Sequence, residues 1–536
     1  MTPLDAVIDA VRDAASALAG TPVDGVRLER PPRPELGDYS TNAPLLLAPR
    51  LGRPPHEIAR ELGDELAARL GAGLERAEVA GPGFVNLHLS DRWFVEALAG
   101  ILAAGASYGS LDAERHPPIN VEFVSANPTG PLHIGHARQA AYGDSLARIL
   151  EFRGFDVTRE FYINDFGSQI VRLAESVRAL ALGEPVPADG YHGDYVAGLV
   201  PAELARTLDL DALGRAAVDA CLERIRESLA RFGVRFDVWF SERALHESGA
   251  VERSLEILRE RGETFDRDGA LWLCTSAHGD DKDRVLVRST GEHTYFTSDI
   301  AYLEDKRERG FERLIYVWGA DHHGYIARVR AVCEALGGDR ESVEILIQQF
   351  VHLIGAEGRT AMSKREGEYV TLDELVDEIG VDAARFFLLA RSHDTTVDLD
   401  LDLALRQSAD NPVYYVQYAH ARIVSMLARA GEERVAEALR EVRAAERLHP
   451  SERSLIHRLV AFPAELQEAA DRRAPHRLTA SVVELAQGFT AFYRDCRVVG
   501  VEPRGTESLR MAVAHAAQRT IATALALLGV GAPDEM

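Results

Sequence analysis

The stretch Ser125-Ala-Asn-Pro-Thr-Gly-Pro-Leu-His-Ile-Gly-His136 decides the fold, because it joins a predicted strand to a predicted helix. Ile119 to Val124, just before it, is a short run typical of a strand. After it, alanine, leucine and isoleucine recur at three- and four-residue spacing from Ala137 to Leu150, as on one face of a helix. Gly154 predicts the end of that helix, and Val157 to Ile163 predicts the next strand. This order predicts a βαβ unit of a doubly wound parallel sheet.

A second run of the same kind covers about residues 295–352. The predicted strand Leu314 to Trp318 leads into Gly319-Ala-Asp-His-His-Gly324, and a helical segment and the strand Val343 to Ile347 follow. The stretch between the two runs is too long for a loop and predicts an inserted subdomain at about 180–290. We therefore expect one Rossmann-type α/β domain over 113–400, split by that insertion.

Two further domains flank this sheet. Residues 1–112 combine a helical start with a Gly/Pro-rich middle, which predicts a small N-terminal α+β module. From Leu372 onward the pattern is almost wholly helical, and residues 401–536 predict an all-α bundle. A chain of 536 residues is long enough for two to four such domains.

Composition narrows the class of protein. With 46% hydrophobic and 27% charged residues, the chain is typical of a globular protein. No apolar run approaches 18 residues, and the N-terminus lacks a basic segment followed by an apolar one, so we expect neither a membrane span nor secretion. The four cysteines are scattered singly, which argues against a zinc knuckle and a disulfide framework and favours the cytoplasm. We find no dedicated metal site in the sequence.

The net charge of −24 would by itself argue against a nucleic-acid partner. Its distribution weakens that objection, because residues 403–536 hold 17 arginines against 16 acidic residues and are near neutral. The last quarter of the chain could therefore accept a polyanion that the rest would repel.

His133, Gly135 and His136 form the first candidate site. A helix that begins near Gly135 turns its free N–H groups and the positive end of its dipole toward the site, which suits phosphate. Gly135 lets a nucleotide approach the backbone closely. His133 and His136 can both donate to charge that develops on a phosphoryl group. The alternative is two structural histidines near a helix cap, but the position between strand and helix favours the functional interpretation.

The second candidate is Ala361-Met-Ser-Lys-Arg-Glu-Gly367, in a glycine-flanked loop after the later strands. Lys364 can move onto the phosphates as pyrophosphate leaves, and Ser363 can hydrogen-bond an oxygen. A solvated loop lysine is the alternative. It is weakened because the chain has only three lysines, Lys282, Lys306 and Lys364, against 57 arginines.

Together these motifs resemble the HIGH and KMSKS elements of class I aminoacyl-tRNA synthetases. Val121-Glu-Phe-Val-Ser-Ala-Asn-Pro-Thr-Gly-Pro-Leu-His-Ile-Gly-His136 and Asp410-Asn-Pro-Val-Tyr-Tyr-Val-Gln-Tyr-Ala-His-Ala-Arg422 resemble the arginyl branch in particular. The resemblance covers essentially the whole chain, and it implies an N-terminal module for the tRNA elbow and a C-terminal anticodon-binding bundle. Ala361 and Arg365 depart from the five-residue motif, whereas Lys364 is kept.

The resemblance implies that the enzyme activates L-arginine with ATP and transfers it to tRNA(Arg), with Mg²⁺ accompanying ATP. It implies His133, His136 and Lys364 as catalytic residues. No covalent intermediate is needed, so catalysis would rest on positioning and electrostatic stabilisation. The resemblance also implies a role for bound tRNA in arginine activation, and the sequence leaves open whether tRNA is obligatory. We expect a monomer without membrane association.

The resemblance also implies the substrate contacts. Glu122 and Asn127 would hold the backbone end of arginine, and Tyr295 and Asp299 would bind its guanidinium, with His322 nearby. Guanidinium needs a planar set of acceptors and at least one acid, so Asp299 is the sharpest expectation. Its alternative role is the N-cap of a helix that begins at Ile300. The ATP site would comprise these residues: Gly135, Gly319, Asp321, His322, Met362 and Ser363.

Tyr414, Tyr415 and Tyr418 lie at helical spacings and are candidates for stacking on tRNA bases. An aromatic stripe at this spacing is as often part of a core, and the sequence leaves both interpretations open.

Two rival functions make different demands on the sequence. A small nucleotidylyltransferase or ligase would lack a helical C-terminal domain of this size. A non-catalytic tRNA-binding paralogue would have lost His133, His136 or Lys364, and all three are present.

Overall fold

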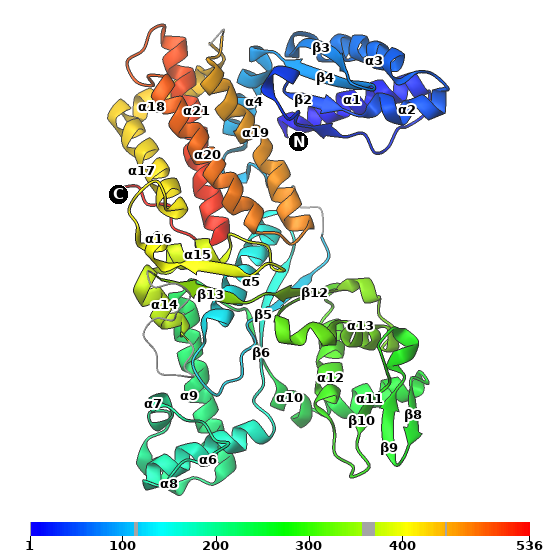
Figure 1. The fold of residues 1–536 in the computed structure, drawn as a ribbon, viewed down its shortest axis with the longest axis vertical. Coiled ribbons are helices and arrows are strands. Elements are labelled where there is room, and N and C mark those ends of the chain that lie inside the picture. The colour runs from blue at the N-terminus through cyan, green and yellow to red at the C-terminus, as the bar shows by residue number, and fades with distance from the viewer. Residues whose placement is uncertain (1, 112–115, 356–369, 445–446) are drawn as a thin grey trace.

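The computed structural model describes residues 2–111, 116–355, 370–444 and 447–536. A helical bundle forms one end of the long axis, with the N-terminal module beside it (Figure 1). The central sheet lies below the bundle, and two lobes extend from the sheet toward the other end of the molecule (Figure 1).

The central sheet has five parallel strands in the order β12-β11-β5-β6-β7. The chain runs from β5 toward β6 on one side and from β11 toward β12 on the other, so β5 and β11 meet at a topological switch point. Helix α5 (Ile134–Phe152) connects β5 to β6, which confirms the predicted βαβ unit. The strands are β5 (Ile119–Phe123), β6 (Val157–Ile163), β7 (Val238–Ser241), β11 (Arg313–Gly319) and β12 (Val343–Gln348).

The lobe between β6 and β7 is helical, and the lobe after β7 is mixed. The first contains α6 (Ser168–Leu182), α7 (Asp194–Ala197), α8 (Ala202–Thr207) and α9 (Leu210–Arg231). The second contains α10 (Glu242–Glu247), α11 (Ala250–Glu260), β8 (Thr264–Arg267), β9 (Ala270–Leu273), β10 (Arg284–Val287), α12 (Tyr295–Glu308) and α13 (Ile326–Ala335).

Strand β7 lies inside the stretch 180–290, which the sequence predicted to be inserted as a whole. It is instead the edge strand of the central sheet, next to β6. It has only four residues, all partly buried, and so short a run is not distinctive enough in the sequence to predict a strand.

The N-terminal module is an antiparallel sheet of order β1-β2-β4-β3, with helices packed against it. Its elements are α1 (Pro3–Ala19), β1 (Leu28–Glu29), β2 (Tyr39–Thr41), α2 (Ala43–Leu51), α3 (Pro55–Leu70), β3 (Leu74–Ala80) and β4 (Phe84–Leu89). The next helix, α4 (Asp91–Ala104), packs against the C-terminal bundle (Figure 1).

The C-terminal region is helical, as predicted, apart from one short parallel pair of strands, β13 (Val351–Ile354) and β14 (Val397–Asp400). Its helices are α14 (Leu372–Ile379), α15 (Val381–Leu388), α16 (Leu401–Leu405), α17 (Pro412–Ala430), α18 (Glu432–Arg440), α19 (Pro450–Asp471), α20 (His476–Asp495) and α21 (Arg504–Leu528). Within the described ranges, only α21 is long and apolar enough to cross a membrane, and 67% of that window is buried inside the protein, as in a core helix.

Candidate active site

The chain makes a strained turn where β5 ends at the switch point. Val124 and Ser125 have φ angles of 67° and 40°, and a β-branched residue rarely adopts such a conformation. The Ser125 hydroxyl donates to Oε1 of Glu122 at 3.1 Å and accepts the backbone N–H of Tyr162 at 3.1 Å. These bonds hold the turn between β5 and β6 and lead the chain toward the helix that follows.

His133 and His136 cap the N-terminus of α5. The Nδ1 of His133 accepts the N–H of Gly135 at 3.0 Å, and the Nδ1 of His136 accepts the N–H of His133 at 3.2 Å. Because each Nδ1 is an acceptor, the Nε2 of each neutral ring carries the proton. The two rings stack with their centroids 3.7 Å apart. Both histidines can therefore donate an N–H in the neutral state.

Burial keeps these two histidines neutral. Desolvation lowers the pKa of His133 and outweighs the opposing effect of the Asp321 carboxylate. Desolvation, followed by repulsion from His133, lowers the pKa of His136 to about 3. Gly135 permits this arrangement, because a Cβ there would come within 2.8 Å of Cε1 of His133. The glycine thus makes room for the His133 ring, a reason that its sequence context did not reveal.

The turn after β11 is the second part of the candidate site. Gly319 ends the strand, and Asp321 and His322 follow on a short 3-10 helix, Ala320–Tyr325. The two side chains are largely exposed and lie 3.2 Å apart (Nδ1 to Oδ1). With its amide oriented to satisfy both partners, Gln139 accepts the N–H of Gly319 at 3.0 Å and donates to the Val124 carbonyl at 3.3 Å. Gln139, which the sequence analysis did not single out, therefore ties the two turns together.

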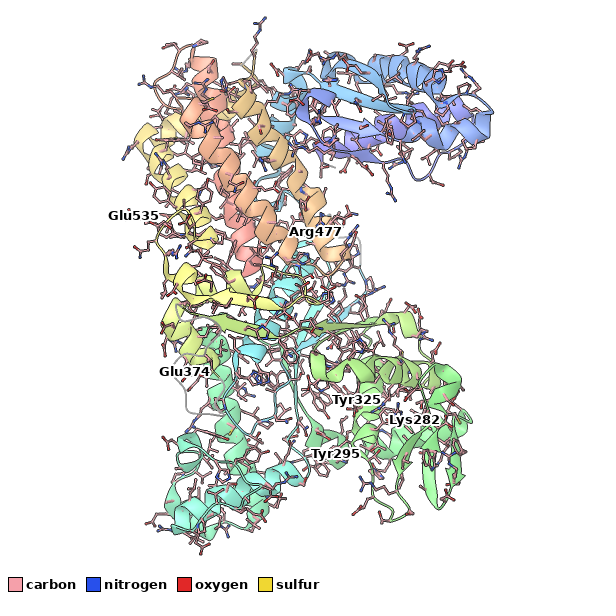
Figure 2. The ribbon with its side chains drawn as sticks, in the orientation of Figure 1. Lys282, Tyr295, Tyr325, Glu374, Arg477 and Glu535 are labelled. Carbon is pink, nitrogen blue, oxygen red and sulfur yellow. The ribbon has the colours of Figure 1, made fainter. Side chains whose placement is uncertain are left out.

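Helix α12 carries the residues that the sequence predicted for guanidinium. Tyr295 begins the helix and is 61% exposed, with its hydroxyl against Gly167. Figure 2 shows Tyr295 and Tyr325 on the mixed lobe. The alternative role of Asp299 as an N-cap is wrong, because Thr294 occupies the N-cap position and Asp299 lies within the helix. Asp299 is therefore not needed to begin the helix, and its side chain reaches solvent.

Asp299 belongs to a group of acidic side chains. Desolvation by the surrounding protein, followed by repulsion from the carboxylates of Glu242 and Glu122, raises the pKa of Asp299 to about 7, against the opposing charge of Arg328. Because the side chain of Asp299 touches solvent, desolvation raises its pKa less than it would for a fully enclosed carboxyl group. The repulsion from Glu242 and Glu122 raises the pKa of Asp299 in addition. Burial also raises the pKa of Glu242 to about 7. Such a group favours the binding of a cation.

The sequence did not single out Glu242. It is 3% exposed and directly follows β7, at the carboxyl end of a parallel strand where ligands of such sheets bind. An acidic residue directly after a strand of the central sheet would have marked Glu242 as a candidate. The sequence analysis missed it because it placed this stretch in the insertion and not in the sheet.

Glu122 and Asn127 differ in their accessibility. Glu122 is 4% exposed, and besides Ser125 it accepts a hydrogen bond from Lys306 at 2.6 Å. Each carboxylate oxygen can accept two hydrogen bonds, so Glu122 keeps capacity for a ligand. Asn127 is exposed, and its backbone carbonyl accepts the N–H of Thr129 at 2.8 Å.

Met362, Ser363 and Lys364 lie outside the described residues. The described chain resumes at Val370, whose carbonyl accepts the N–H of Ile134 at 2.9 Å. Thr371 forms an isolated antiparallel bridge with His133. The segment that follows the second motif is therefore bonded directly to the first.

The tyrosines of α17 border a groove, and Tyr415 also packs against the hydrophobic core. Tyr414 and Tyr418 stack with centroids 6.2 Å apart, and the Tyr415 hydroxyl donates to Thr490 at 2.9 Å. Tyr418 is 42% exposed. The groove between α17 and α20 has a volume of about 350 Å³, and an adjoining hollow of about 710 Å³ is lined by four arginines: Arg422, Arg429, Arg494 and Arg497. Aromatic faces beside arginines suit unpaired bases and phosphates.

Three family models match successive parts of the chain. The arginyl tRNA synthetase N terminal domain matches residues 5–89. The class I (R) tRNA synthetase catalytic domain matches residues 97–180 and 215–423. The DALR anticodon binding domain matches residues 416–536.

Whole proteins give the same result. The chain is 44% identical to the arginine–tRNA ligase of Carboxydothermus hydrogenoformans and 45% identical to that of Geobacillus kaustophilus, in each case over 95% of this chain and 94% of the relative. The solved arginyl-tRNA synthetase of Thermus thermophilus is 26% identical with a TM-score of 0.78, over 99% of this chain and 100% of that one. The match with a putative arginyl-tRNA synthetase from Campylobacter jejuni is 33% identical with a TM-score of 0.76, over 84% of this chain and 100% of that one.

Proposed function

The chain belongs to the arginyl-tRNA synthetases of class I, and we propose that it joins arginine to tRNA(Arg) at the switch point of its central sheet. As a member of this family it activates L-arginine with ATP to arginyl-adenylate and then transfers the arginyl group to tRNA. The assignment of these steps to particular residues is our proposal.

The proposed ATP site lies between the N-terminus of α5 and the turn after β11. The Nε2–H groups of His133 and His136 donate to the phosphate oxygens as the arginine carboxylate attacks the α-phosphorus. Gly319, Asp321 and His322 take the adenosine ribose. Met362, Ser363 and Lys364 reach the phosphates from the second motif, so that Lys364 neutralises the leaving pyrophosphate. Mg²⁺ enters with ATP as part of the substrate.

The proposed arginine site lies beside it, among the acidic side chains. Asp299 pairs with the guanidinium and Tyr295 covers it, with His322 nearby, while Glu122 and Asn127 hold the α-amino and carboxylate end. Asp299 carries this proposal, because it is an accessible acid whose carboxylate is repelled by those of Glu242 and Glu122. Binding of the guanidinium relieves that repulsion.

The proposed division of labour follows the domains. Residues 1–112 bind the tRNA elbow, residues 113–400 carry the chemistry with an inserted subdomain, and residues 401–536 bind the anticodon through Tyr414, Tyr415 and Tyr418. The groove between α17 and α20, with its arginines, supports the last assignment. We further propose that the enzyme acts as a monomer in the cytoplasm, free of membrane.

ATP–pyrophosphate exchange with each amino acid in turn, run with and without tRNA, tests this proposal. Exchange should be specific for arginine. Dependence on tRNA would show that arginine activation needs the bound partner. Exchange with a different amino acid, or none under either condition, would contradict the proposal.

A further inference from the structure

Lys306 is fully buried near the end of α12, although lysine is among the side chains that proteins bury least. Its Nζ lies 2.6 Å from Oε2 of Glu122, and the side chain is 0% exposed. The rings of Tyr302 and Tyr316 lie 4.3 and 4.1 Å from the same nitrogen and add cation–π contacts. Burial of the Lys306 ammonium group costs desolvation energy, whereas burial of an apolar side chain of similar size does not. A buried ion pair is therefore weak evidence that Lys306 serves only to stabilise the fold.

The neighbouring glutamate has a cation of its own. Glu160 on β6 is the register partner of Glu122 on β5. Arg309 donates two hydrogen bonds to Glu160, at 2.6 and 2.9 Å, whereas Lys306 is 3.9 Å from it. Loss of Lys306 would therefore leave Glu160 paired and would leave Glu122 without a close cation among the residues that the structure describes. The structure thus directs the charge of Lys306 mainly to Glu122.

The Lys306–Glu122 bond joins the two halves of the active site. Lys306 lies on α12, the helix whose first turns carry Tyr295 and Asp299. Glu122 lies on β5, the strand that leads into Ser125 and then to His133 and His136. The carboxylates of Asp299 on α12 and Glu122 on β5 repel each other. The positive charge of Lys306, which is paired with Glu122, reduces this repulsion between the two elements.

We propose that Lys306 is a positioning residue for the arginine site, which fixes Glu122 relative to Asp299 so that both carboxylates meet one arginine molecule. The proposal rests on the arginine site described above. Lys306 acts through Glu122 and does not touch the substrate, because it is fully buried beneath the site. Its loss should therefore weaken arginine binding and leave ATP binding nearly unchanged.

The test is aminoacylation kinetics of the full-length Lys306→Met enzyme with tRNA present. We expect the KM for arginine to rise about tenfold or more and the KM for ATP to change less than about twofold. Lys306→Arg, which keeps the cation, should recover most of the arginine KM. Arg385→Met is the matched control, because Arg385 is equally buried and its guanidinium lies 2.6 Å from Asp144, outside the arginine site. It should lower the thermal midpoint without raising the arginine KM.

A double-mutant cycle shows whether Lys306 acts through Glu122. The Lys306→Met/Glu122→Gln enzyme, which removes both buried charges and is the fallback if the single variant does not fold, should have the arginine KM of Glu122→Gln alone. Additive effects would overturn the proposal. So would an arginine KM for Lys306→Met that rises no more than that of Arg385→Met. If Lys306→Met and Asp299→Asn both leave the arginine KM unchanged, the proposed arginine site itself is wrong. If Asp299→Asn raises it and Lys306→Met does not, only the role of Lys306 fails.

Discussion

The imidazole rings of His133 and His136 stack at 3.7 Å, and each uses its Nδ1 to accept a backbone N–H. This arrangement fixes the tautomer of both rings and directs the chemistry to Nε2. It depends on Gly135, where a side chain would collide with the His133 ring.

Gly135→Ala should therefore impair adenylate formation while the protein stays folded. The new Cβ would lie 2.8 Å from Cε1 of His133, so the ring must leave its place and its donor moves away from the phosphate. Loss of one well-placed donor typically lowers kcat by about 10²–10³-fold, and we expect a fall of about that size in pyrophosphate exchange. Gly324→Ala on the neighbouring turn is the control, since its Cβ would meet open space. Equal activity of the two variants would contradict this role for Gly135.

Lys364→Ala should lower kcat for pyrophosphate exchange with little change in the KM for arginine or ATP. The reason is that the lysine charge acts mainly on the pyrophosphate as it leaves. Lys282→Ala serves as the control, because Lys282 is exposed in the turn between β9 and β10, on the mixed lobe (Figure 2). Wild-type exchange by the Lys364 variant would remove this lysine from the mechanism.

Tyr418→Ala should weaken tRNA binding without affecting the small substrates. Stacking of a base on an aromatic ring contributes about 1–3 kcal/mol, so we expect the KM for tRNA to rise about five- to hundredfold. Leu405→Ala is a suitable control, because Leu405 is 50% exposed nearby but does not line the groove. A tRNA KM that stays the same in both variants would place the anticodon elsewhere.

Arginine binding should strengthen as the pH rises from 6 to about 7.5. Asp299 has a raised pKa of about 7 in the free site, so it is partly protonated below that pH, whereas guanidinium binds the carboxylate form. The KM for arginine should therefore fall by at most about tenfold per pH unit below pH 7 and level off above it. The neutral His136 adds nothing in this range, since burial lowers its pKa to about 3.

Glu242→Gln supplies the control for this pH dependence. It removes the neighbouring carboxylate that raises the pKa of Asp299 most, so the midpoint of the profile should move to lower pH. A KM for arginine that is independent of pH between 6 and 8 would show that Asp299 does not titrate at the site.

Much of the fold could be predicted because its signals are local. The strand before Ser125 and the helix after His136 follow one another within one βαβ unit, so apolar spacing alone identified them. The edge strand β7 was not predicted, because its four residues are too few to show a clear pattern. The N-cap role suggested for Asp299 was wrong, because the helix begins five residues earlier, with Thr294 at the N-cap position and Asp299 inside the helix.

The rest of the site depends on contacts between distant segments. Gln139 joins the turns after β5 and β11, and Lys306 joins α12 to β5, so neither role has a local signature. Glu242 approaches Asp299 only because β7 lies in the central sheet. The site is built from the ends of several strands, so these residues could be predicted only once the order of the strands in the sheet was known.

The central claim is that Asp299 binds the guanidinium of arginine, and the KM for arginine of Asp299→Asn tests it most directly. The substitution keeps the size of the side chain but removes its charge. Loss of a hydrogen bond to a charged group typically costs about 1.5–3 kcal/mol, and about 1.4 kcal/mol corresponds to a tenfold change. We therefore predict that the KM for arginine rises by about ten- to hundredfold, that the KM for ATP barely moves, and that circular dichroism shows an intact fold. Unchanged arginine kinetics in the folded variant would contradict the account and make Glu122 the next candidate.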